Sequence, residues 1–392
     1  MLKIKTGLEV LREDGYKPLR GQRVGLFTNA SAINSEFDSA YFVLWRSERV
    51  NLVALFAPEH GLTNTQSAGE PGSSHRDLAT GLDIHNLYGQ GDRPKAEMLA
   101  NVDVLVCDIQ DIGIRYHTYV WTISRILEAA GEAGVTVVIL DRPNPLGGKT
   151  IYGPSLEQGL SSQVGRYPIP VRHSLTLGEL VWMINETWNP HLARLSIIPC
   201  ENWRREMIWS DTKLPWVPPS PDIPCERTLS HYAGACLVEG TNLSEGRGTT
   251  LPFEVLGTPW IDAIGLAQHL NRQDWCERFG VRFRAHQFQP LTSKYAGEYC
   301  KGVQVYITDK DMWRPIEAWL SVIAEIRHLY PERFEWLPPQ KEGGLRHFDR
   351  LIGTRRIRES IDMKKPVHEL STYWAVIADD FAEARKPFLL YE

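Results

Sequence analysis

Four clusters of polar and ionisable side chains follow apolar runs of the sequence, and their residue types could bind a sugar and perform acid/base catalysis. The clusters are Thr28 with Asn29, Glu59 with His60, Asp108 with Gln110 and Asp111, and Asp141 with Arg142 and Asn144. Open α/β sheets bind their ligands at one edge, outside the carboxyl ends of the strands. Four clusters at that edge are harder to explain by turns and helix caps alone, so we expect a functional site there.

The densest cluster follows the apolar residues 102–106, which predict a buried strand. Its polar members are Asp108, Gln110, Asp111, Arg115, Tyr116 and His117. A segment with helical spacing, Tyr119–Glu132, comes next. Asp111 could be a catalytic carboxylate, or it could form an ion pair with Arg115 that fixes the loop. Both interpretations remain open at this point.

Glu59 follows a proline at the end of the predicted strand 51–57 and precedes His60. Partial burial would raise the pKa of this carboxyl, which could then protonate a leaving oxygen at neutral pH. The alternative is a structural carboxylate that accepts backbone hydrogen bonds in the turn Pro58–Gly61. We favour the catalytic role, because strand-end carboxylates with perturbed pKa values cluster at functional sites.

A second carboxylate is needed in most glycoside hydrolysis. Glu239 ends the apolar segment Ala235–Glu239, which we interpret as a buried strand, and Glu245 lies on the glycine-rich loop that follows. Either one could supply that group. Arg115 and Arg247 could hold a substrate carboxylate through bidentate hydrogen bonds, or either could be a surface residue.

Motifs for several other chemistries are absent. The loop 28–35 contains no glycine, so it matches neither the dinucleotide-binding fingerprint nor a phosphate loop. The nucleophile-elbow and zinc-protease motifs are missing as well. Four histidines share no metal-ligand spacing: His60, His75, His85 and His117. We expect no cofactor and no metal, although a metal-dependent hydrolase using Asp108, Asp111 and His60 remains the competing enzyme hypothesis.

Alternating strands and helices in the first half predict a mostly parallel sheet. The expected strands are 23–28, 51–57, 102–106 and 134–140, and the expected helices are 36–49, with Asn34 or Ser35 as N-cap, 119–132, and 176–189, which a capping box opens. The proline-rich stretch 217–224 must run extended and predicts a crossing between domains. A smaller α+β domain follows, with helices at 262–272, 315–330 and 366–385 and strands at 281–286 and 302–308.

Composition excludes several classes of function. The 392 residues suggest two domains, and a formal charge of −5 gives no electrostatic support for a nucleic-acid or anionic-membrane partner. No run approaches the roughly 18 apolar residues of a membrane span, and the N-terminus lacks the apolar core of a signal peptide. We therefore expect a cytoplasmic protein without membrane insertion. The six scattered cysteines, Cys225 and Cys236 included, are expected as free thiols.

Several stretches together resemble the exo-β-N-acetylmuramidases, a bacterial family long catalogued as a domain of unknown function. The matching stretches are Gly25–Asn29, Ala57–Gly61, Thr80–Leu82, Leu87–Gly89, Asp108–Arg115, Thr118–Tyr119, Leu140–Pro145 and Glu239–Thr250. The resemblance covers nearly the whole chain. The sequence departs from the family's pattern at three positions: Ser174, where glycine is expected, Asp222, where asparagine is expected, and Cys225, where threonine is expected.

The resemblance implies a Rossmann-like domain, a mostly parallel sheet with helices on both faces, followed by a smaller auxiliary domain. We place these domains at 1–230 and 231–392, with the active-site cleft between them. It also implies release of N-acetylmuramic acid from the non-reducing ends of peptidoglycan fragments, in cell-wall recycling if the protein is cytoplasmic. A non-enzymatic muropeptide-binding protein is the remaining alternative, and the oligomeric state is open.

The predicted site combines both lines of reasoning. Glu59 is the expected general acid and Glu239 the leading second carboxylate, with Asp108, Asp111 and Glu245 as alternatives. Asp111 is also expected to hold the strand-end loop and to contribute to catalysis. The expected substrate-binding residues are Asn29, His60, Asp108, Arg115, Tyr116, His117, Asn144, Asn242, Glu245 and Arg247. An arginine would bind the lactyl carboxylate that distinguishes muramic acid from glucosamine.

Overall fold

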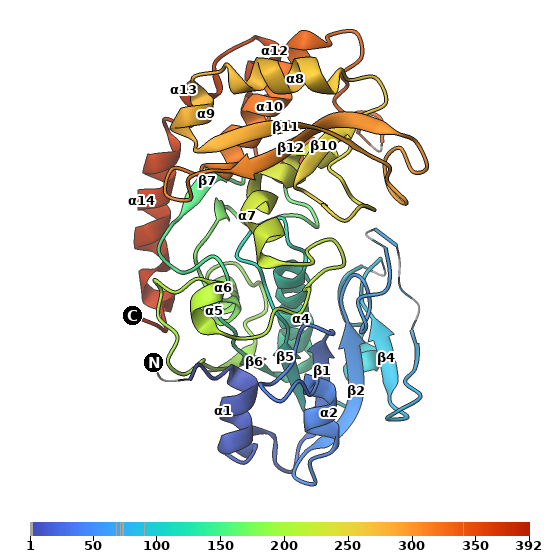
Figure 1. Cartoon of the computed structure of the whole chain (residues 1–392). Coiled ribbons are helices and arrows are strands. Elements are labelled where there is room, and N and C mark those ends of the chain that lie inside the picture. Colours follow the sequence, from blue (N-terminus) through green and yellow to red (C-terminus); the bar gives the residue numbers. More distant parts are fainter. Residues whose placement is uncertain (1–2, 68, 71, 73, 90, 340) are drawn as a thin grey trace. The chain divides into compact units, whose positions relative to one another are not determined.

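The chain forms two compact units, and its elements are labelled in Figure 1. The computed structural model describes residues 3–67, 69, 70, 72, 74–89, 91–339 and 341–392. Unit 1 comprises residues 1–150, 173–224 and 382–392, and unit 2 comprises residues 151–172 and 225–381. The proline-rich stretch 217–224 ends where unit 2 resumes, as expected of a crossing between domains. The division predicted at residue 230 and the cleft between the domains stay predictions.

Unit 1 is built on a seven-stranded sheet in the order β3-β4-β2-β1-β5-β6-β9. Its strands are β1 (Arg23–Thr28), β2 (Asn51–Ala57), β3 (His75–Arg76), β4 (Asp83–Asn86), β5 (Val104–Asp108), β6 (Thr136–Leu140) and β9 (Arg194–Ile198). All neighbours pair in parallel except β3 and β4. The predicted mostly parallel sheet is confirmed.

The helices of unit 1 connect and cover these strands. They are α1 (Gly7–Glu13), the 3₁₀ turn η1 (Lys17–Leu19), α2 (Ala40–Trp45), α3 (Ala96–Leu99), α4 (Tyr119–Ala133), α5 (Leu177–Thr187) and α6 (Trp209–Thr212). The predicted capping box opens α5: Glu179 N donates to Thr176 Oγ1 at 3.3 Å, and Thr176 N donates to the Glu179 carboxylate at 3.0 Å. This pairing satisfies two backbone donors that the first turn leaves open.

Helix α2 is shorter than the predicted helix 36–49, and its N-cap is Ser39. The prediction of Asn34 or Ser35 as the cap was wrong. Asn34 Oδ1 instead accepts the backbone N–H groups of Glu36 and Asp38, each at 2.9 Å. This side chain therefore holds residues 34–38 in a turn, an arrangement in which asparagine competes with helix formation.

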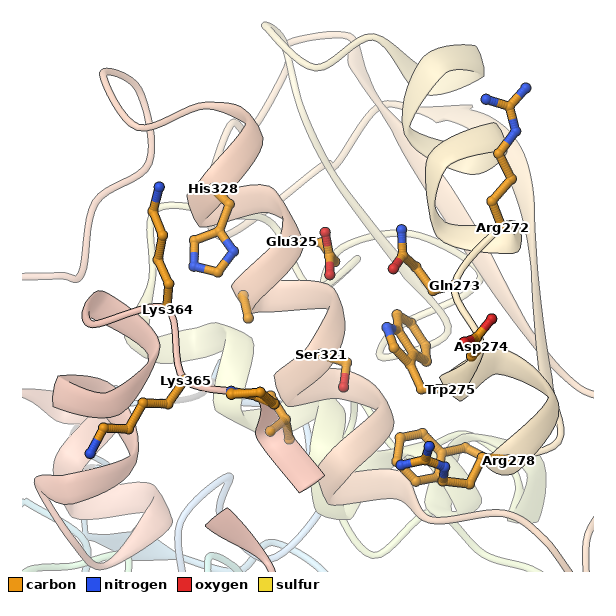
Figure 2. A pocket seen from close by; sticks show the side chains of 14 residues that line it. Arg272, Gln273, Asp274, Trp275, Arg278, Ser321, Glu325, His328, Lys364 and Lys365 are labelled. Carbon is orange, nitrogen blue, oxygen red and sulfur yellow. The ribbon is translucent and has the colours of Figure 1, made fainter. Parts of the chain in front are cut away.

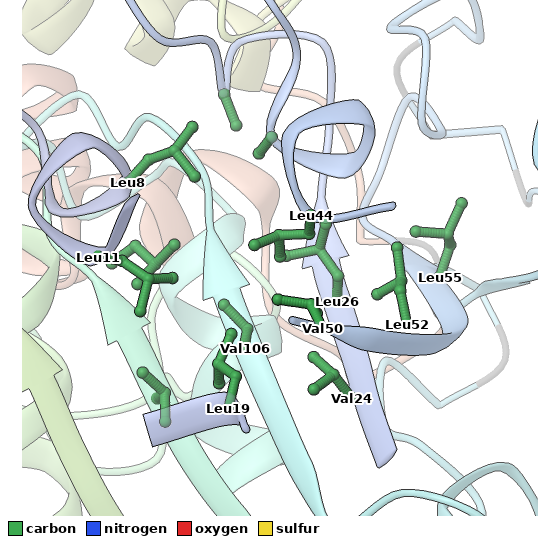
Figure 3. Packing of buried hydrophobic residues seen from close by; sticks show 14 of the residues in the cluster. Leu8, Leu11, Leu19, Val24, Leu26, Leu44, Val50, Leu52, Leu55 and Val106 are labelled. Carbon is green, nitrogen blue, oxygen red and sulfur yellow. The ribbon is translucent and has the colours of Figure 1, made fainter. Parts of the chain in front are cut away.

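A hydrophobic cluster fixes α1 and α2 against the sheet. Figure 3 shows Leu8 and Leu11 of α1 and Leu44 of α2 beside the strand residues Leu26 and Val106. All five side chains are almost completely buried. Burying one such side chain stabilises the fold by about 2 kcal/mol. The strands, and hence the loops at their carboxyl ends, are held in place by this packing.

Unit 2 contains a three-stranded antiparallel sheet in the order β10-β12-β11 and a short pair, β7-β8. These strands are β7 (Tyr152–Ser155), β8 (Pro170–Arg172), β10 (Val255–Thr258), β11 (Val281–Phe288) and β12 (Cys300–Ile307). Its helices are α7 (Glu226–Ala235), the 3₁₀ turn η2 (Cys236–Gly240), α8 (Ala263–Asn271), α9 (Trp275–Arg278), α10 (Pro315–Leu329), α11 (His347–Ile352), α12 (Arg356–Asp362), α13 (Val367–Leu370) and α14 (Trp374–Arg385). The last residues of α14 belong to unit 1, as does the 3₁₀ turn η3 (Lys386–Phe388) that follows. The predicted α+β class is confirmed.

Two predicted elements of this half differ from the structure. The strand predicted at Ala235–Glu239 was wrong, because these residues end α7 and form η2. A short apolar run is compatible with either element, and its periodicity does not distinguish them. The helix predicted over 366–385 is interrupted after Leu370, where the Thr372 hydroxyl donates to the Glu369 carbonyl at 2.9 Å. Among the described helices, none combines the length and apolarity of a membrane span.

Candidate active site

The four predicted polar clusters lie at one edge of the unit 1 sheet. Strands β2, β1, β5 and β6 are consecutive neighbours and run parallel, so their carboxyl ends point in the same direction. Thr28 at the end of β1 pairs in register with Asp108 at the end of β5. The prediction that the four clusters share one edge of the sheet is confirmed, and that this edge is the functional site stays a prediction.

Glu59 lies just beyond β2 and is 9% exposed. Gly69 N donates to its Oε1 at 3.0 Å, and Thr118 Oγ1 donates to its Oε2 at 2.9 Å. Neither donor belongs to the turn Pro58–Gly61, so the carboxylate is held by two other segments of the chain. Such a fixed carboxyl with residual solvent access has the placement that a general acid requires.

Thr118 and Tyr88 are contacts of Glu59 that the sequence analysis did not assign to the site. Burial raises the pKa of Tyr88 well above its usual range, and the charge of Glu59 and a side-chain hydrogen bond with it act in the same direction. Tyr88 follows β4, the neighbour of β2 in the sheet. Its position beyond a strand end was the signal that could have identified it.

His60 is buried beside Glu59 and has a left-handed backbone, with φ 71°. Its Nδ1 lies 2.9 Å from the Gln66 carbonyl, and its Nε2 lies 3.4 Å from Ser220 Oγ. A non-glycine residue in this conformation carries strain that surrounding contacts must offset. His60 therefore helps to fold the loop after Glu59, and its predicted contact with substrate stays a prediction.

Asp111 is buried between two histidines. Its Oδ1 lies 3.3 Å from His117 Nδ1, its Oδ2 lies 3.9 Å from His173 Nε2, and Gly113 N donates to Oδ2 at 2.7 Å. Burial opposes ionisation, yet the hydrogen bond and charge of His117 and the charge of His173 leave the pKa of Asp111 below its usual value. The predicted ion pair with Arg115 stays a prediction, whereas His173 is a partner that sequence reasoning missed.

Arg115 and Tyr116 are both buried in the same loop. Burial lowers the pKa of Arg115 to about 10, and its guanidinium carbon lies 5.9 Å from the centre of the Tyr116 ring. The Arg115 carbonyl accepts the indole N–H of Trp121 at 2.7 Å, which ties the loop to α4. His117 contacts the ring of Tyr119 edge-on at 4.2 Å. The loop is thus part of the core of unit 1, and it also lies at the edge of the sheet where the strands end.

Asp108 forms a buried bidentate ion pair with Arg142. Arg142 Nε and Nη2 donate to its two oxygens at 2.6 and 3.1 Å, and the same guanidinium donates to the Ile33 carbonyl. The pair joins the ends of β5 and β6. A fork-to-fork pair of this kind fixes geometry strongly, so the contacts shown for Asp108 are structural.

Two predicted substrate-binding amides are likewise engaged within the protein. Asn29 Nδ2 donates to Asn64 Oδ1 at 2.9 Å and to Tyr119 Oη at 3.0 Å, and its Oδ1 accepts from Ser31. Asn144 Nδ2 donates to the Leu175 carbonyl at 2.8 Å. Both side chains are almost fully buried. Their contacts join the loops beneath the site, and direct substrate contact stays a prediction for each.

Asp141, the strand-end residue of β6, is a buried centre of hydrogen bonds. It accepts from Thr176 Oγ1 at 2.7 Å, from Gly178 N at 2.8 Å and from Tyr391 Oη at 2.5 Å. Burial raises the pKa of this carboxyl to about 6, although the hydrogen bonds act in the opposite direction. Because its oxygens are bound to α5 and to the C-terminal segment, we assign Asp141 to stability.

Glu239 in unit 2 is partly exposed and lies beside two basic groups. Arg247 Nη2 donates to its Oε1 at 2.8 Å, and His347 Nε2 lies 3.4 Å from its Oε2. Although burial opposes ionisation, these partners hold the pKa of Glu239 well below its usual range. Glu239 therefore stays ionised near neutral pH, as a nucleophile or general base requires. His347 was not predicted.

Glu245 and Asn242 lie on the loop after η2. Lys294 Nζ donates to Glu245 Oε2 at 3.0 Å, and Arg247 Nε lies 3.5 Å from Oε1. Asn242 Nδ2 donates to the Arg333 carbonyl at 2.8 Å. Arg247 thus contacts two protein carboxylates, and a substrate carboxylate would compete with them. The contacts of Glu245 and Asn242 order the loop that carries Arg247.

Two of the departures from the family's pattern have a visible local consequence. Ser174 has φ 55°, a left-handed conformation that glycine adopts without steric cost. Cys225 is the N-cap of α7 and makes no side-chain cap hydrogen bond, whereas threonine is a favoured cap.

All six cysteines are free, as predicted. Within the described residues, no group of three or more His, Cys, Asp or Glu side chains is arranged to hold a metal ion.

Comparison with known proteins agrees with this architecture. Residues 24–227 match the sequence model of the N-terminal part of the exo-β-N-acetylmuramidase NamZ, and residues 230–391 match its C-terminal part. A peptidoglycan β-N-acetylmuramidase NamZ from Bacillus subtilis is 41% identical over 389 residues, which are 99% of this chain and 92% of the relative.

Two solved structures of DUF1343 family proteins from Bacteroides fragilis have the same fold. One has a TM-score of 0.88 at 36% identity and covers 100% of both chains. The other has a TM-score of 0.78 at 29% identity, and the match covers 100% of this chain and 99% of the chain in that structure.

Proposed function

The chain belongs to the exo-β-N-acetylmuramidase NamZ family, and from this premise we propose that it releases N-acetylmuramic acid from the non-reducing ends of peptidoglycan fragments. Such a reaction is a glycoside hydrolysis that needs a proton donor for the leaving oxygen. The carboxyl of Glu59, held beyond β2 with residual solvent access, is the observation that carries the proposal.

Glu59 acts as the general acid in this scheme. Its two hydrogen bonds fix the carboxyl in one orientation, so that its proton can be aimed at the glycosidic oxygen. Gly69 N can only donate, whereas the Thr118 hydroxyl can also accept a hydrogen bond from the protonated acid. Thr118 can therefore serve both protonation states of Glu59 during the reaction.

Glu239 is the proposed second carboxylate. It remains ionised beside Arg247 and His347, which suits attack on the sugar or activation of water. An arginine is still proposed to recognise the lactyl carboxylate. Arg247 is a stronger candidate than Arg115, because its side chain is partly exposed whereas Arg115 is fully buried. The cytoplasmic location stays a prediction.

The test compares two chromogenic substrates, an N-acetylmuraminide and an N-acetylglucosaminide. We expect turnover of the muraminide, and Glu59→Gln should reduce kcat/KM by roughly 10²- to 10⁴-fold. Glu70→Gln is the matched control, because Glu70 is an exposed carboxylate on the same loop. Turnover of the glucosaminide alone, or full activity of Glu59→Gln, would contradict the proposal.

A further inference from the structure

A polar pocket of about 500 Å³ lies in unit 2 and contains none of the predicted catalytic or substrate-binding residues. Figure 2 shows its walls: the end of α8 with α9 on one side, α10 in the middle, and the segment between α12 and α13 on the other side. Its volume is that of a site for a small molecule or for a few units of a polymer. The proposed hydrolysis does not use it.

Basic side chains dominate the rim of the pocket. Arg272, Arg278, Lys364 and Lys365 all line it and are exposed. In the part of the chain that the structure describes, none of these four forms an ion pair. The lining contains two carboxylates: Glu325 is 2.7 Å from His269, and Asp274 is exposed and adds one negative charge against the four positive ones. The rim is therefore positively charged and complementary to an anionic ligand.

The backbone presents Lys364 and Lys365 together at this rim. Helix α12 ends with Lys364 N donating to the Ile361 carbonyl and Lys365 N donating to the Ser360 carbonyl, each at 3.0 Å. Lys364 has φ 58°, a position after a helix end that glycine fills most easily. A lysine occupies this strained position, so Lys364 and Lys365 place two adjacent positive charges at the rim of the pocket.

The inner part of the pocket offers a flat ring and hydrogen-bonding groups. Trp275 is half-buried and its ring is fixed edge-on against Phe283, with 5.7 Å between the ring centres. Figure 2 shows the indole facing the interior, near Ser321 and Gln273. A rigid aromatic ring beside hydroxyl and amide groups suits the combined apolar and polar faces of a sugar.

We propose that this pocket binds the glycan strand of peptidoglycan through its carboxylates, as an anchoring site separate from the hydrolytic residues. The inference rests on the proposed function, which makes a carboxylate-bearing saccharide the substrate. The lysines and arginines contact lactyl or peptide-stem carboxylates, and Trp275 stacks on a sugar ring. Anchoring raises the local concentration of strand ends, an effect of multivalent binding, and it benefits polymers more than disaccharides.

The test replaces two charges without altering the core. Lys364→Gln with Lys365→Gln should weaken binding to glycan strands freed of peptides roughly three- to tenfold, because each exposed charge contact contributes only modestly. Lys301→Gln with Lys310→Gln is the matched control, since it removes two exposed lysines of the same unit outside the pocket. We expect its affinity to equal that of the unmodified protein. Equal affinity of the Lys364 and Lys365 variant would overturn the proposal.

Three further ligands identify the chemistry. Strands with intact stem peptides should bind at least as tightly, and tighter binding than that of bare strands would assign the contact to stem carboxylates. Strands whose carboxylates have been amidated should bind about as weakly as the double variant does. Polyphosphate that competes fully with bare strands at equal charge would overturn the assignment to a saccharide.

Turnover separates this inference from the proposed function. The chromogenic muraminide is too small to use an anchor, so the Lys364 and Lys365 variant should cleave it at the normal rate. If the unmodified protein cleaves no muraminide but its strand binding depends on these lysines, the proposed function fails and the anchoring site stands. If it cleaves muraminide and the lysines do not affect strand binding, only the anchoring site fails.

Discussion

Thr118 Oγ1 donates a hydrogen bond of 2.9 Å to Glu59 Oε2, which joins the residue before α4 to the loop after β2. The two residues are 59 positions apart in the sequence. The connection places the proposed acid and the loop of Asp111 and His117 in one rigid arrangement. Thr118 is therefore a positioning residue for Glu59.

Thr118→Val should reduce kcat/KM for the muraminide roughly tenfold, the effect of losing about 1.4 kcal/mol of transition-state stabilisation with the hydrogen bond that orients the acid. The valine keeps the shape of threonine and removes only the hydroxyl. Thr118→Ser retains that hydroxyl and should keep most of the activity. Steady-state kinetics measure the effect, and equal activity of the valine and serine variants would exclude the positioning role.

Asp111→Ala should lose both stability and activity. Removing this carboxylate leaves His117 and His173 without their buried partner, and breaking a buried pair costs about 3–5 kcal/mol. Urea denaturation at neutral pH measures the change, with Asp103→Ala, which breaks a surface pair, as the milder comparison. A fully stable and active Asp111→Ala variant would show that the loop does not depend on this pair.

Asp141 should make the folded state less stable as pH rises from about 4 to about 6. Its folded-state pKa of about 6 exceeds the ordinary 3.8, so the folded state holds the proton more tightly than the unfolded state does. This contribution to the free energy of unfolding is fully present below the unfolded-state pKa of 3.8 and is lost as the pH rises through the folded-state pKa of about 6. It amounts to at most about 3 kcal/mol.

Asp141→Asn isolates this effect, because asparagine does not titrate. We expect the difference in unfolding free energy between the unmodified protein and the variant to shift in favour of the variant across that pH interval, and to stay constant at higher pH. Urea titrations at closely spaced pH values provide the measurement. A difference that does not vary with pH would mean that Asp141 titrates normally.

Arg247→Gln should move the acidic limb of the pH-rate profile to higher pH. Arg247 is the principal group that lowers the pKa of Glu239 against the opposing effect of burial, so its removal raises that pKa. Activity at mildly acidic pH should then fall more than activity at neutral pH. Arg247→Lys keeps the charge and serves as the control; unchanged profiles in both variants would exclude Glu239 as a group whose ionisation limits the rate.

The sheet and the edge at which the polar clusters gather were predictable because their signals are local. Apolar runs end in polar clusters at Thr28, Glu59, Asp108 and Asp141, and the parallel order of the strands then brings the clusters together. Strands β1 and β2 match their predicted bounds. The capping box of α5 was equally local, because its two partners are three residues apart.

The partners of the site residues were not predictable in the same way. His173 reaches Asp111 from a segment 62 positions later, and Lys294 reaches Glu245 across 49 positions. No pattern of residue types marks such distant contacts. The strand assigned to Ala235–Glu239 failed for a different reason, since a run of four apolar residues fits both a helix end and a strand.

The return of residues 382–392 to unit 1 has a consequence for biosynthesis. Tyr391 completes the bonds of Asp141, and Leu390 N donates to Glu179 Oε1 at 2.8 Å. A ribosome makes all of unit 2 before it releases these residues. Unit 1 therefore cannot complete the hydrogen bonds of Asp141 and Glu179 until residues 382–392 have been synthesised, which happens only after all of unit 2 has been made.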